Sequence, residues 1–196
     1  MNKLLADLVR LLELERLEQN LFRGESRDIG SPQVFGGQVL GQALQAASAT
    51  VEGRLVHSLH AYFLRRGDFN APIIYEVDRS RDGASFTNRR VVAIQHGQQI
   101  FHMSASFQIE EEGPDHQVGA PEVTPPEQLP DMTTGVRKHL DGMAADRRRF
   151  WSLERPWEYR SVEPIEAGGP RPGARHLWFR LIDRCPDDPP LHLFLL

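Results

Sequence analysis

Two glycines and an amide stand where a predicted loop meets the start of a predicted helix. Phe35, Gly36, Gly37 and Gln38 precede a run of small and apolar residues at 39–50. The first N–H groups of a helix have no intrahelical acceptor and lie at the positive end of the helix dipole, so they can bind an anion or polarise a carbonyl group. The same glycines are also expected where a helix packs too closely against a sheet to leave room for a Cβ atom.

A basic group surrounds a second predicted turn, at Asp82–Gly83. Four arginines flank this turn on two neighbouring predicted strands: Arg79, Arg81, Arg89 and Arg90. Guanidinium groups bind phosphates through paired, charge-assisted hydrogen bonds, which makes this end of the sheet a candidate phosphate site. Adjacent strand residues point to opposite faces, so at least one of Arg89 and Arg90 is expected to be a surface residue. The only lysines are Lys3 and Lys138, and a bias in genome composition would also explain this preference for arginine.

His57 and His60 raise the question of a metal or catalytic site. In a regular strand, residues three apart point to opposite faces, so these two side chains are not expected to share an ion. We expect each to pack or hydrogen-bond within the sheet, with His57 kept as a residue that lines a site. Cys185 is the only cysteine, which excludes an internal disulfide and disfavours a cysteine-based zinc site. We therefore predict no metal site.

The remaining patterns exclude several functional classes. The sequence has no nucleophile elbow, P-loop, dinucleotide fingerprint or His-Glu-x-x-His zinc motif. A formal net charge of −4 disfavours a nucleic-acid-binding protein. No segment approaches the roughly 20 consecutive apolar residues of a membrane span, and an acid interrupts the apolar run at residues 1–7, unlike in a signal peptide. These features predict a cytoplasmic globular protein without membrane insertion.

The N-terminal part of the chain predicts an α+β module. Apolar residues at helical spacing indicate an amphipathic helix from its N-cap Asn2 to about Glu18, and a buried helix over 39–50. A short strand is expected near residues 20–24. Longer strand patterns, rich in β-branched and aromatic residues, lie at 54–64, 73–81, 85–95 and 100–109. Glycine-containing turns at 81–84 and 96–97 are typical of hairpins, so we expect an antiparallel sheet wrapped around a central helix.

A second, shorter part follows a proline-rich segment. We divide the chain into residues 1–111, residues 112–150 with a linker and a polar helix within 133–150, and residues 151–196. Strand patterns at 157–165 and 176–183 flank a glycine- and proline-rich loop at 168–173, and five of the last six residues, 191–196, are large and apolar. Two strands and a short helix bury too little apolar surface to be stable alone. We interpret 151–196 as the start of a second module that is truncated or completed by another subunit.

Several of these segments form an ordered set of motifs. They are Leu21–Gly24, Gln33–Val39, Leu55–Arg65, Arg81–Gly83 with Ser85–Phe86, Arg89–Val91 and Ala105–Gln108. Read together, they closely resemble the type II acyl-CoA thioesterases. The resemblance extends from the first helix to the last residue and is densest over residues 21–108.

The resemblance implies a double hot-dog fold, in which two modules each wrap an antiparallel sheet around a long helix. It implies hydrolysis of fatty acyl-CoA to a free fatty acid and coenzyme A, without a metal or organic cofactor. In this family an Asp, a Ser or Thr and a Gln of the second module activate the attacking water, and backbone N–H groups stabilise the oxyanion. All three are expected after Leu196, so we assign no catalytic residue within the chain.

The resemblance leaves the N-terminal module with a role in binding acyl-CoA or the second module. The residues expected to line these surfaces are Phe35, Gly36, Gly37, Gln38, His57, Arg81, Asp82, Gly83, Ser85, Phe86, Arg89 and Arg90. Homo-oligomers are common among hot-dog proteins, and we expect one here. Two other functions stay open: a naturally short protein that binds acyl-CoA or a partner without hydrolysis, and a hot-dog hydratase or dehydratase. The latter needs a proton-transfer pair that the sequence does not place.

Overall fold

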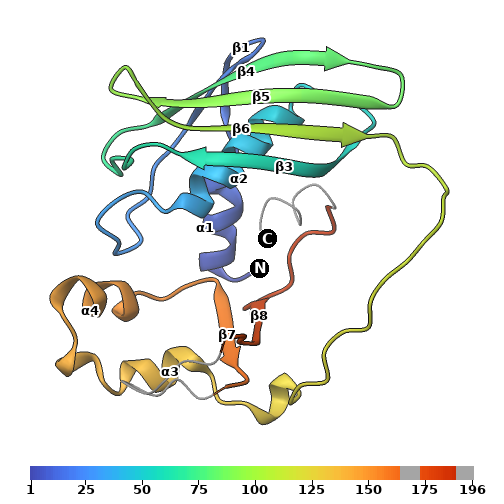
Figure 1. Ribbon diagram of the computed structural model, residues 1–196. Coiled ribbons are helices and arrows are strands. Elements are labelled where there is room, and N and C mark those ends of the chain that lie inside the picture. Colours follow the sequence, from blue (N-terminus) through green and yellow to red (C-terminus); the bar gives the residue numbers. More distant parts are fainter. Residues whose placement is uncertain (164–172, 189–196) are drawn as a thin grey trace. The chain divides into compact units, whose positions relative to one another are not determined.

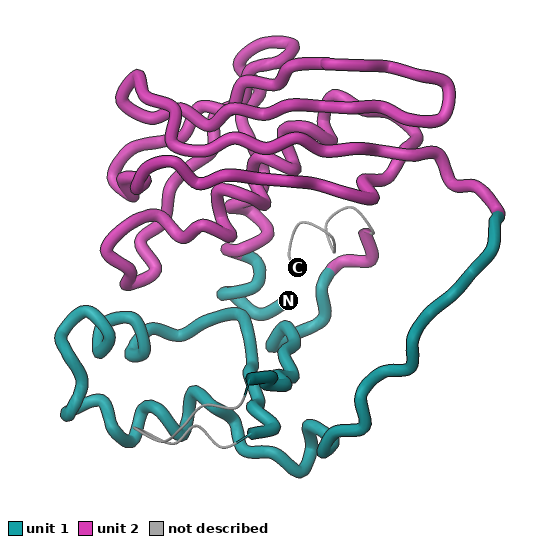
Figure 2. The backbone as a smooth tube through the Cα atoms, in the orientation of Figure 1, with its two compact units in different colours: residues 1–6, 113–185 teal, residues 7–112, 186–196 magenta. Residues whose placement is uncertain are grey.

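The computed structural model describes residues 1–163 and 173–188, which form two compact units. The first, which we name the sheet unit, contains residues 7–112 together with 186–188 (Figure 2). The second, which we name the C-terminal unit, contains residues 113–185 together with residues 1–6. The predicted loop residues 168–172 and the apolar residues 191–196 lie outside the described residues.

A six-stranded antiparallel sheet dominates the sheet unit, in the order β1-β2-β4-β5-β6-β3 (Figure 1). The strands are β1 (Glu15–Glu18), β2 (Leu21–Gly24), β3 (Leu55–Phe63), β4 (Ile73–Asp82), β5 (Phe86–Gln95) and β6 (Gln98–Gln108). The four long strands lie within two residues of their predicted limits. At the hairpin between β5 and β6, His96 and Gly97 have φ angles of 49° and 73°, as a two-residue turn with left-handed backbone requires. This confirms the predicted α+β class and antiparallel pairing.

Helix α2 (Gly36–Ser48) packs on one face of this sheet and forms the core with it. Its buried residues include Val39, Ala43 and Ala47. Every second residue of β5 and of most of β6 is buried as well, for example Val91 and Met103. The small side chains let the helix approach the sheet closely, which confirms the predicted buried helix, although it begins three residues before the expected start at residue 39.

The first predicted helix is shorter than expected. Helix α1 (Lys3–Leu12) ends before the predicted limit at about Glu18, and residues 15–18 form strand β1 instead of a further helical turn. Asn2 caps the helix as predicted, because its Oδ1 accepts a hydrogen bond from the backbone N–H of Leu4 at 2.9 Å. Strand β1 pairs with β2 in antiparallel register, and an ion pair of 2.5 Å joins Glu15 to Arg23 across the two strands. Tertiary pairing therefore outweighs the local helical spacing.

The C-terminal unit contains short elements. They are the 3-10 turns η1 (Pro126–Gln128) and η2 (Leu140–Gly142), the helices α3 (Met132–Arg137) and α4 (Ala145–Ser152), and the antiparallel strands β7 (Trp157–Ser161) and β8 (Leu177–Leu181). The single polar helix expected within 133–150 is thus two short helices. The first is capped by Asp131, whose carboxylate accepts the Thr134 N–H at 2.7 Å. Across the described parts of both units, no helix is long and apolar enough to cross a bilayer.

Candidate functional site

The start of α2 offers free backbone donors. Phe35 precedes the helix in an extended conformation, and no side chain caps the helix. The carbonyl oxygen of Phe35 accepts hydrogen bonds from the N–H groups of Gln38 and Val39, at 3.1 and 3.3 Å. Within the described residues, the N–H groups of Gly36 and Gly37 are therefore left without a side-chain acceptor, at the positive end of the helix dipole.

A surface pocket of about 410 Å³ lies beside this helix start. We name it the helix-start pocket; it is lined by Gln33, Val34, Gly36, Val39, Phe63, Leu64, Arg65, Arg66, Gly67, Ile100 and Phe101. Its walls are mainly apolar and aromatic, and the charged residues in its lining are Arg65 and Arg66. Arg65 is held in place by a 2.7 Å hydrogen bond from its Nη1 to the carbonyl oxygen of Gln99. The pocket thus combines an apolar surface with positive charge and has Gly36, the first residue of α2, in its lining, which suits an elongated apolar ligand with a polar or anionic group.

Gly36 also has a steric reason to be glycine. Its Cβ atom would lie 3.2 Å from the ring of Phe63 on β3, so both explanations offered by the sequence, close packing and free donors, apply to it. A Cβ atom on Gly37 would lie 2.5 Å from the ring of Phe35, but that ring is exposed and can move aside. Gln38 has a different role, because its buried amide Nε2 donates to the Glu25 carbonyl oxygen at 3.0 Å and holds the preceding loop.

Arg89, predicted as a phosphate ligand, lies in the interior with only 2% of its surface exposed. Its five N–H donors all have acceptors. Nε donates to Thr50 Oγ1 (2.8 Å), Nη1 to the carbonyl oxygens of Arg81 and Asn88 (3.2 and 2.9 Å), and Nη2 to the Thr50 carbonyl oxygen and Asp82 Oδ1 (3.0 and 2.6 Å). No donor is left for a ligand, so the expectation of a phosphate-binding Arg89 is corrected: it joins the end of α2 to the β4–β5 turn.

Arg54, which the sequence reasoning missed, holds the same turn from the other side. Its Nη2 donates to the carbonyl oxygens of Gly83 and Ala84 at 2.8 Å each, and its Nη1 bonds Thr87. The hydrogen bond from Arg89 holds the pKa of the Asp82 carboxyl below its usual range. The only available signal for Arg54 was a basic residue directly before a strand, which does not distinguish it from a surface arginine.

The two predicted groups lie at opposite ends of α2. Residues 35–38 precede the helix or begin it, whereas Arg89 bonds Thr50, just beyond its last residue. Thirteen helical residues separate the ends by about 20 Å. The tertiary structure therefore forms two distinct sites from the predicted residues.

His57 and His60 lie on the same face of the sheet, which corrects the expectation that they point apart. A β-bulge at Val56–Ser58 places two residues of β3 against one of β6. His57 Nε2 is 2.9 Å from Ser106 Oγ, and His60 pairs with Ser104, two residues along the same exposed face. His57 also contacts the ring of Phe86 edge-on, at 5.7 Å between centroids. Among the described residues, no three His, Cys, Asp or Glu side chains are grouped for a metal ion.

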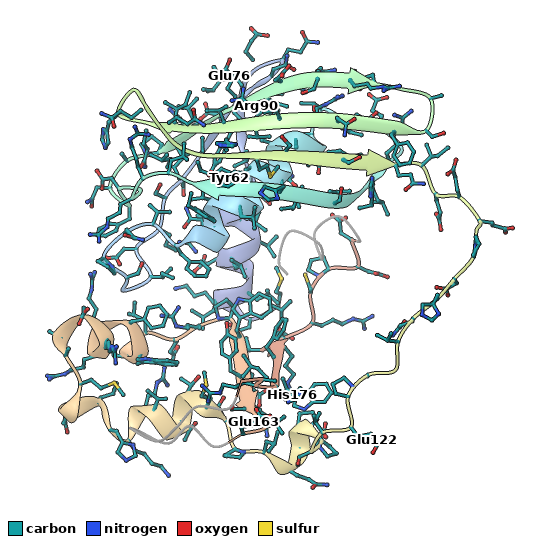
Figure 3. The ribbon with its side chains drawn as sticks, in the orientation of Figure 1. Tyr62, Glu76, Arg90, Glu122, Glu163 and His176 are labelled. Atoms are coloured by element: carbon teal, nitrogen blue, oxygen red, sulfur yellow. The ribbon has the colours of Figure 1, made fainter. Side chains whose placement is uncertain are left out.

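Arg90 lies on this outer face, as its position next to the buried Arg89 requires (Figure 3). It pairs across the strands with Asp78 and Ser104. Neither Arg90 nor His57 lines the helix-start pocket. Arg81, Ser85 and Phe86 belong to the β4–β5 turn and its edges, with the exposed ring of Phe86 turned toward His57.

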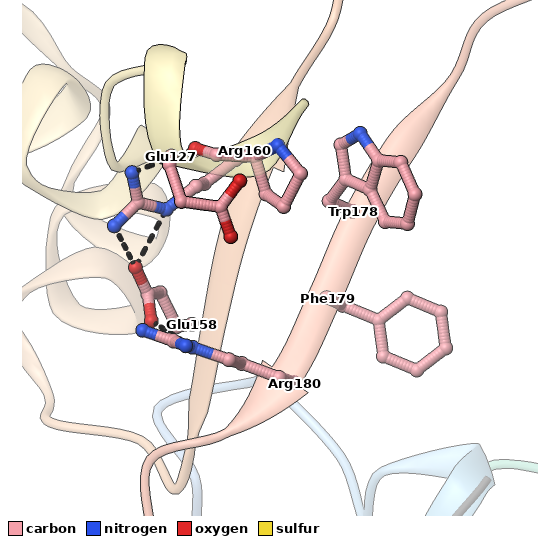
Figure 4. Close-up of a pocket in the computed structure, with 7 residues that line it drawn as sticks. Glu127, Glu158, Arg160, Trp178, Phe179 and Arg180 are labelled. Atoms are coloured by element: carbon pink, nitrogen blue, oxygen red, sulfur yellow. Dashed lines mark hydrogen bonds and ion pairs between the residues drawn. The ribbon is translucent and has the colours of Figure 1, made fainter. Parts of the chain in front are cut away.

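The C-terminal unit has its own polar network, beside a small pocket of about 160 Å³ (Figure 4). Glu158 accepts hydrogen bonds from Arg160 Nε at 2.7 Å and Arg180 Nε at 2.6 Å. Arg160 Nη1 also donates to the carbonyl oxygens of Pro126 and Leu129, at 2.9 and 2.5 Å. These bonds fix strand β7 to the segment before α3. All three guanidinium nitrogens of Arg160 are engaged by Glu158 and these carbonyl oxygens, whereas among the described residues the exposed Arg180 uses only its Nε.

A family match covers most of the sheet unit. Residues 23–108 match the family described as the acyl-CoA thioesterase N-terminal domain. "Acyl-CoA thioesterase 2" of Haemophilus influenzae is 41% identical over 192 residues, which are 96% of this chain and 67% of that protein. Human "acyl-coenzyme A thioesterase 8" is 43% identical over 162 residues, covering 79% of this chain and 51% of that protein.

A solved structure agrees with these sequence matches. The crystal structure of an acyl-CoA thioesterase II, TesB2, from Mycobacterium marinum is similar with a TM-score of 0.73 and 40% sequence identity. The similarity covers 96% of this chain and 64% of that one. The sheet wrapped around α2 is thus the hot-dog fold. The chain spans between about half and two thirds of the length of these relatives.

Proposed function

The chain belongs to the acyl-CoA thioesterase family, and on that premise we propose that it forms the substrate-binding module of an enzyme that hydrolyses fatty acyl-CoA. In this reaction, water adds its oxygen to the thioester carbonyl carbon and the C–S bond breaks. The products are a fatty acid and coenzyme A, whose sulfur takes up a proton. The observation that carries the proposal is the helix-start pocket, where free N–H groups adjoin an apolar surface within the matched segment.

The start of α2 suits the thioester carbonyl. As water attacks, negative charge develops on the carbonyl oxygen, and N–H groups already aimed at it stabilise the transition state. We assign this role to the backbone N–H groups of Gly36 and Gly37. The apolar walls formed by Phe63, Phe101 and Val39 suit an acyl chain, and no metal or organic cofactor is needed for these steps.

The groups that activate the water are proposed to follow Leu196. The relatives are longer than this chain, and the family resemblance places the Asp, the Ser or Thr and the Gln in a second module. We propose a double hot-dog protein, whose second module begins within residues 151–196. Strand β3 supports this proposal, since it ends the sheet with a long edge that exposes apolar side chains, and proteins ordinarily protect or cover such an edge.

Thiol release from acyl-CoA tests the proposed function. We expect the protein in its full natural length to release one thiol per fatty acid formed, with the Cys185→Ser variant removing the background thiol of the chain. Gly36→Val should lower kcat/KM by about tenfold or more, equivalent to ~1.4 kcal/mol, because a branched side chain would enter the helix-start pocket. Gly113→Val is the matched control, since open space surrounds Gly113.

Three outcomes decide between the functions left open by the sequence. Thiol release that the Gly36→Val change lowers supports the proposal. Saturable acyl-CoA binding without thiol release contradicts hydrolysis and favours a binding protein. Hydration of an enoyl-CoA without thiol release would assign the pocket to a hydratase.

A further inference from the structure

A second pocket, of about 430 Å³, lies at the end of α2 remote from the helix-start pocket. We name it the arginine pocket, because four of the residues lining it are Arg16, Arg54, Arg79 and Arg89. The only carboxylates in its lining are those of Glu52 and Asp82, so the positive charges outnumber the negative ones by two. A pocket with two surplus positive charges is suited to a dianion.

Two of these arginines build the pocket and the other two are available to a ligand. Arg54 and Arg89 are engaged by the β4–β5 turn and by Thr50. Arg79 uses only its Nε, which donates to Asn20 Oδ1 at 2.8 Å. Arg16 donates through Nη2 to the Gln19 carbonyl oxygen at 2.9 Å and through Nε to the Glu18 carbonyl oxygen at 3.4 Å. Within the described part of the chain, Nη1 of Arg16 and both terminal nitrogens of Arg79 have no hydrogen-bond acceptor.

The two available guanidinium groups come from different strands but converge on one turn. Arg16 belongs to β1 and Arg79 to β4, and their hydrogen bonds end on the adjacent residues Gln19 and Asn20. This turn therefore holds both groups at the rim of the same pocket. Of the two carboxylates in the lining, Asp82 is already paired with Arg89 at 2.6 Å. Guanidinium forks in such an arrangement are best matched by the oxygens of a phosphate group.

We propose that the arginine pocket binds a phosphate group of a nucleotide, with Arg16 and Arg79 as the direct ligands. Two sources share this chemistry. One is a phosphate of the acyl-CoA substrate itself, an assignment that rests on the proposed function. The other is a separate nucleotide that binds independently of hydrolysis. Phosphate binding at this end of α2 uses none of the groups assigned to the thioester.

Equilibrium binding tests the proposal directly. The probes are coenzyme A, dephospho-coenzyme A, which lacks the 3′-phosphate, and ATP, each titrated by calorimetry at low ionic strength into the protein in its full natural length. In the Arg16→Gln/Arg79→Gln double variant, we expect the Kd of at least one phosphate-bearing probe to rise about tenfold or more. Arg10→Gln is the matched control, because Arg10 is an exposed arginine that lines none of the pockets described above.

The probes distinguish the two sources. If the substrate supplies the phosphate, the double variant raises the Kd of coenzyme A and the KM of acyl-CoA, leaves kcat unchanged, and leaves the Kd of ATP unchanged. If dephospho-coenzyme A also binds the unaltered protein more weakly than coenzyme A does, the 3′-phosphate is the group bound in the arginine pocket. If a separate nucleotide binds, the Kd of ATP rises in the double variant while the KM of acyl-CoA stays constant. Equal affinities of the double variant and Arg10→Gln for all three probes would overturn the proposal.

Two further measurements keep the test decisive. If the double variant unfolds, Arg79→Lys retains the charge but loses the planar fork, and its affinity should lie between those of the unaltered protein and a folded Arg79→Gln variant. If the unaltered protein releases no thiol from any acyl-CoA, the proposed hydrolysis fails. The calorimetric comparison still decides whether the arginine pocket binds phosphate.

Discussion

Single residues in this chain owe their roles to the hydrogen bonds available around them. Arg89 and Arg90 are adjacent and chemically identical, yet one lies in the interior with every donor engaged and the other lies on the exposed face of the sheet. A buried guanidinium is tolerated only when acceptors surround it, and carbonyl oxygens at the end of α2 and on β4 supply them. Residue type therefore indicates what chemistry is possible, and burial decides whether a ligand can use it.

Arg89→Met is expected to destabilise the sheet unit by roughly 3 kcal/mol, because it leaves buried carbonyl oxygens without donors. Arg89→Lys should recover only part of this loss, since an ammonium group has three donors instead of five. Urea unfolding of both variants measures the effect, with Arg90→Met as the control on the exposed face. A loss below about 0.5 kcal/mol for Arg89→Met, the range of ordinary surface substitutions, would contradict the structural role.

Glu163 is expected to titrate far below an ordinary glutamate. His176 donates to it from the imidazole Nδ1 and from the backbone N–H, each at 2.7 Å, and these bonds lower the pKa of Glu163 to about 2. A carboxyl whose folded pKa is depressed stabilises the fold at neutral pH. That stabilisation is lost as the pH falls from 4.5 toward about 2.

The His176→Leu variant separates the two hydrogen bonds to Glu163. The pKa of Glu163 should rise in this variant, because the hydrogen bond from the imidazole is the larger cause of its low value. It should stay below 4.5, since the backbone N–H of residue 176 still donates to the carboxylate. Titration of the carboxyl carbon by NMR measures both values, and His116→Leu in the exposed linker should leave the pKa unchanged. An unchanged pKa in His176→Leu would rule out the imidazole as its main cause.

At the scale of elements, α2 and β2 approach each other around a buried polar cluster. Gln42, on the buried face of α2, donates through Nε2 to the carbonyl oxygens of Leu11 and Glu25, and its Oε1 accepts from the Tyr75 hydroxyl at 2.8 Å. Burial raises the pKa of that hydroxyl well above its usual value, so Tyr75 remains a donor. Gly24 on β2 lies directly against the Gln42 amide. The absence of a side chain at Gly24 is what lets the strand and the helix share this cluster.

Gly24→Ala is expected to destabilise the protein by roughly 1–3 kcal/mol, because its Cβ would lie 2.7 to 2.9 Å from the Gln42 amide, which three hydrogen bonds hold in place. The denaturation midpoint measures this loss. Gly113→Ala, in open space, is the control. In a Gln42→Ala background, which lacks the clashing amide, adding Gly24→Ala should cause little further loss of stability. If the double variant instead loses the sum of the two single losses, the clash lies elsewhere.

The two edges of the sheet differ at the scale of the whole molecule. Strand β1 has only four residues, three of them charged, which protects an edge against pairing with other chains. Strand β3 has nine residues and exposes Leu59, Tyr62 and Phe63, at 40%, 55% and 57%. In the C-terminal unit, β8 similarly exposes Trp178 and Phe179. Surfaces of this kind mark interfaces, and we propose that the second module and other subunits cover them.

The 196-residue chain expressed by itself is therefore expected to self-associate. Light scattering coupled to gel filtration should show species larger than a monomer. Leu59→Lys should shift them toward the monomer, because a charge on an edge strand opposes strand pairing. Val118→Lys, an equally polar change at an exposed linker residue, should leave the mass distribution unaltered. A monomeric chain would show that the β3 edge needs no partner.

The sequence by itself determined the buried helix, the four long strands and their antiparallel pairing, because alternating burial, helical spacing and glycine turns are local properties of the chain. Its ordered set of motifs determined the family. It also singled out residues 35–38 and the arginines near Asp82 as candidate binding groups, but their positions at opposite ends of α2 follow only from the tertiary structure. Only the tertiary structure decided that Arg89 is internal, that the bulge at Val56–Ser58 brings His57 and His60 to one face, and that residues 15–18 pair with β2. These outcomes depend on partners distant in sequence, such as Thr50 for Arg89 and Ser106 for His57, and local spacing carries no information about such partners.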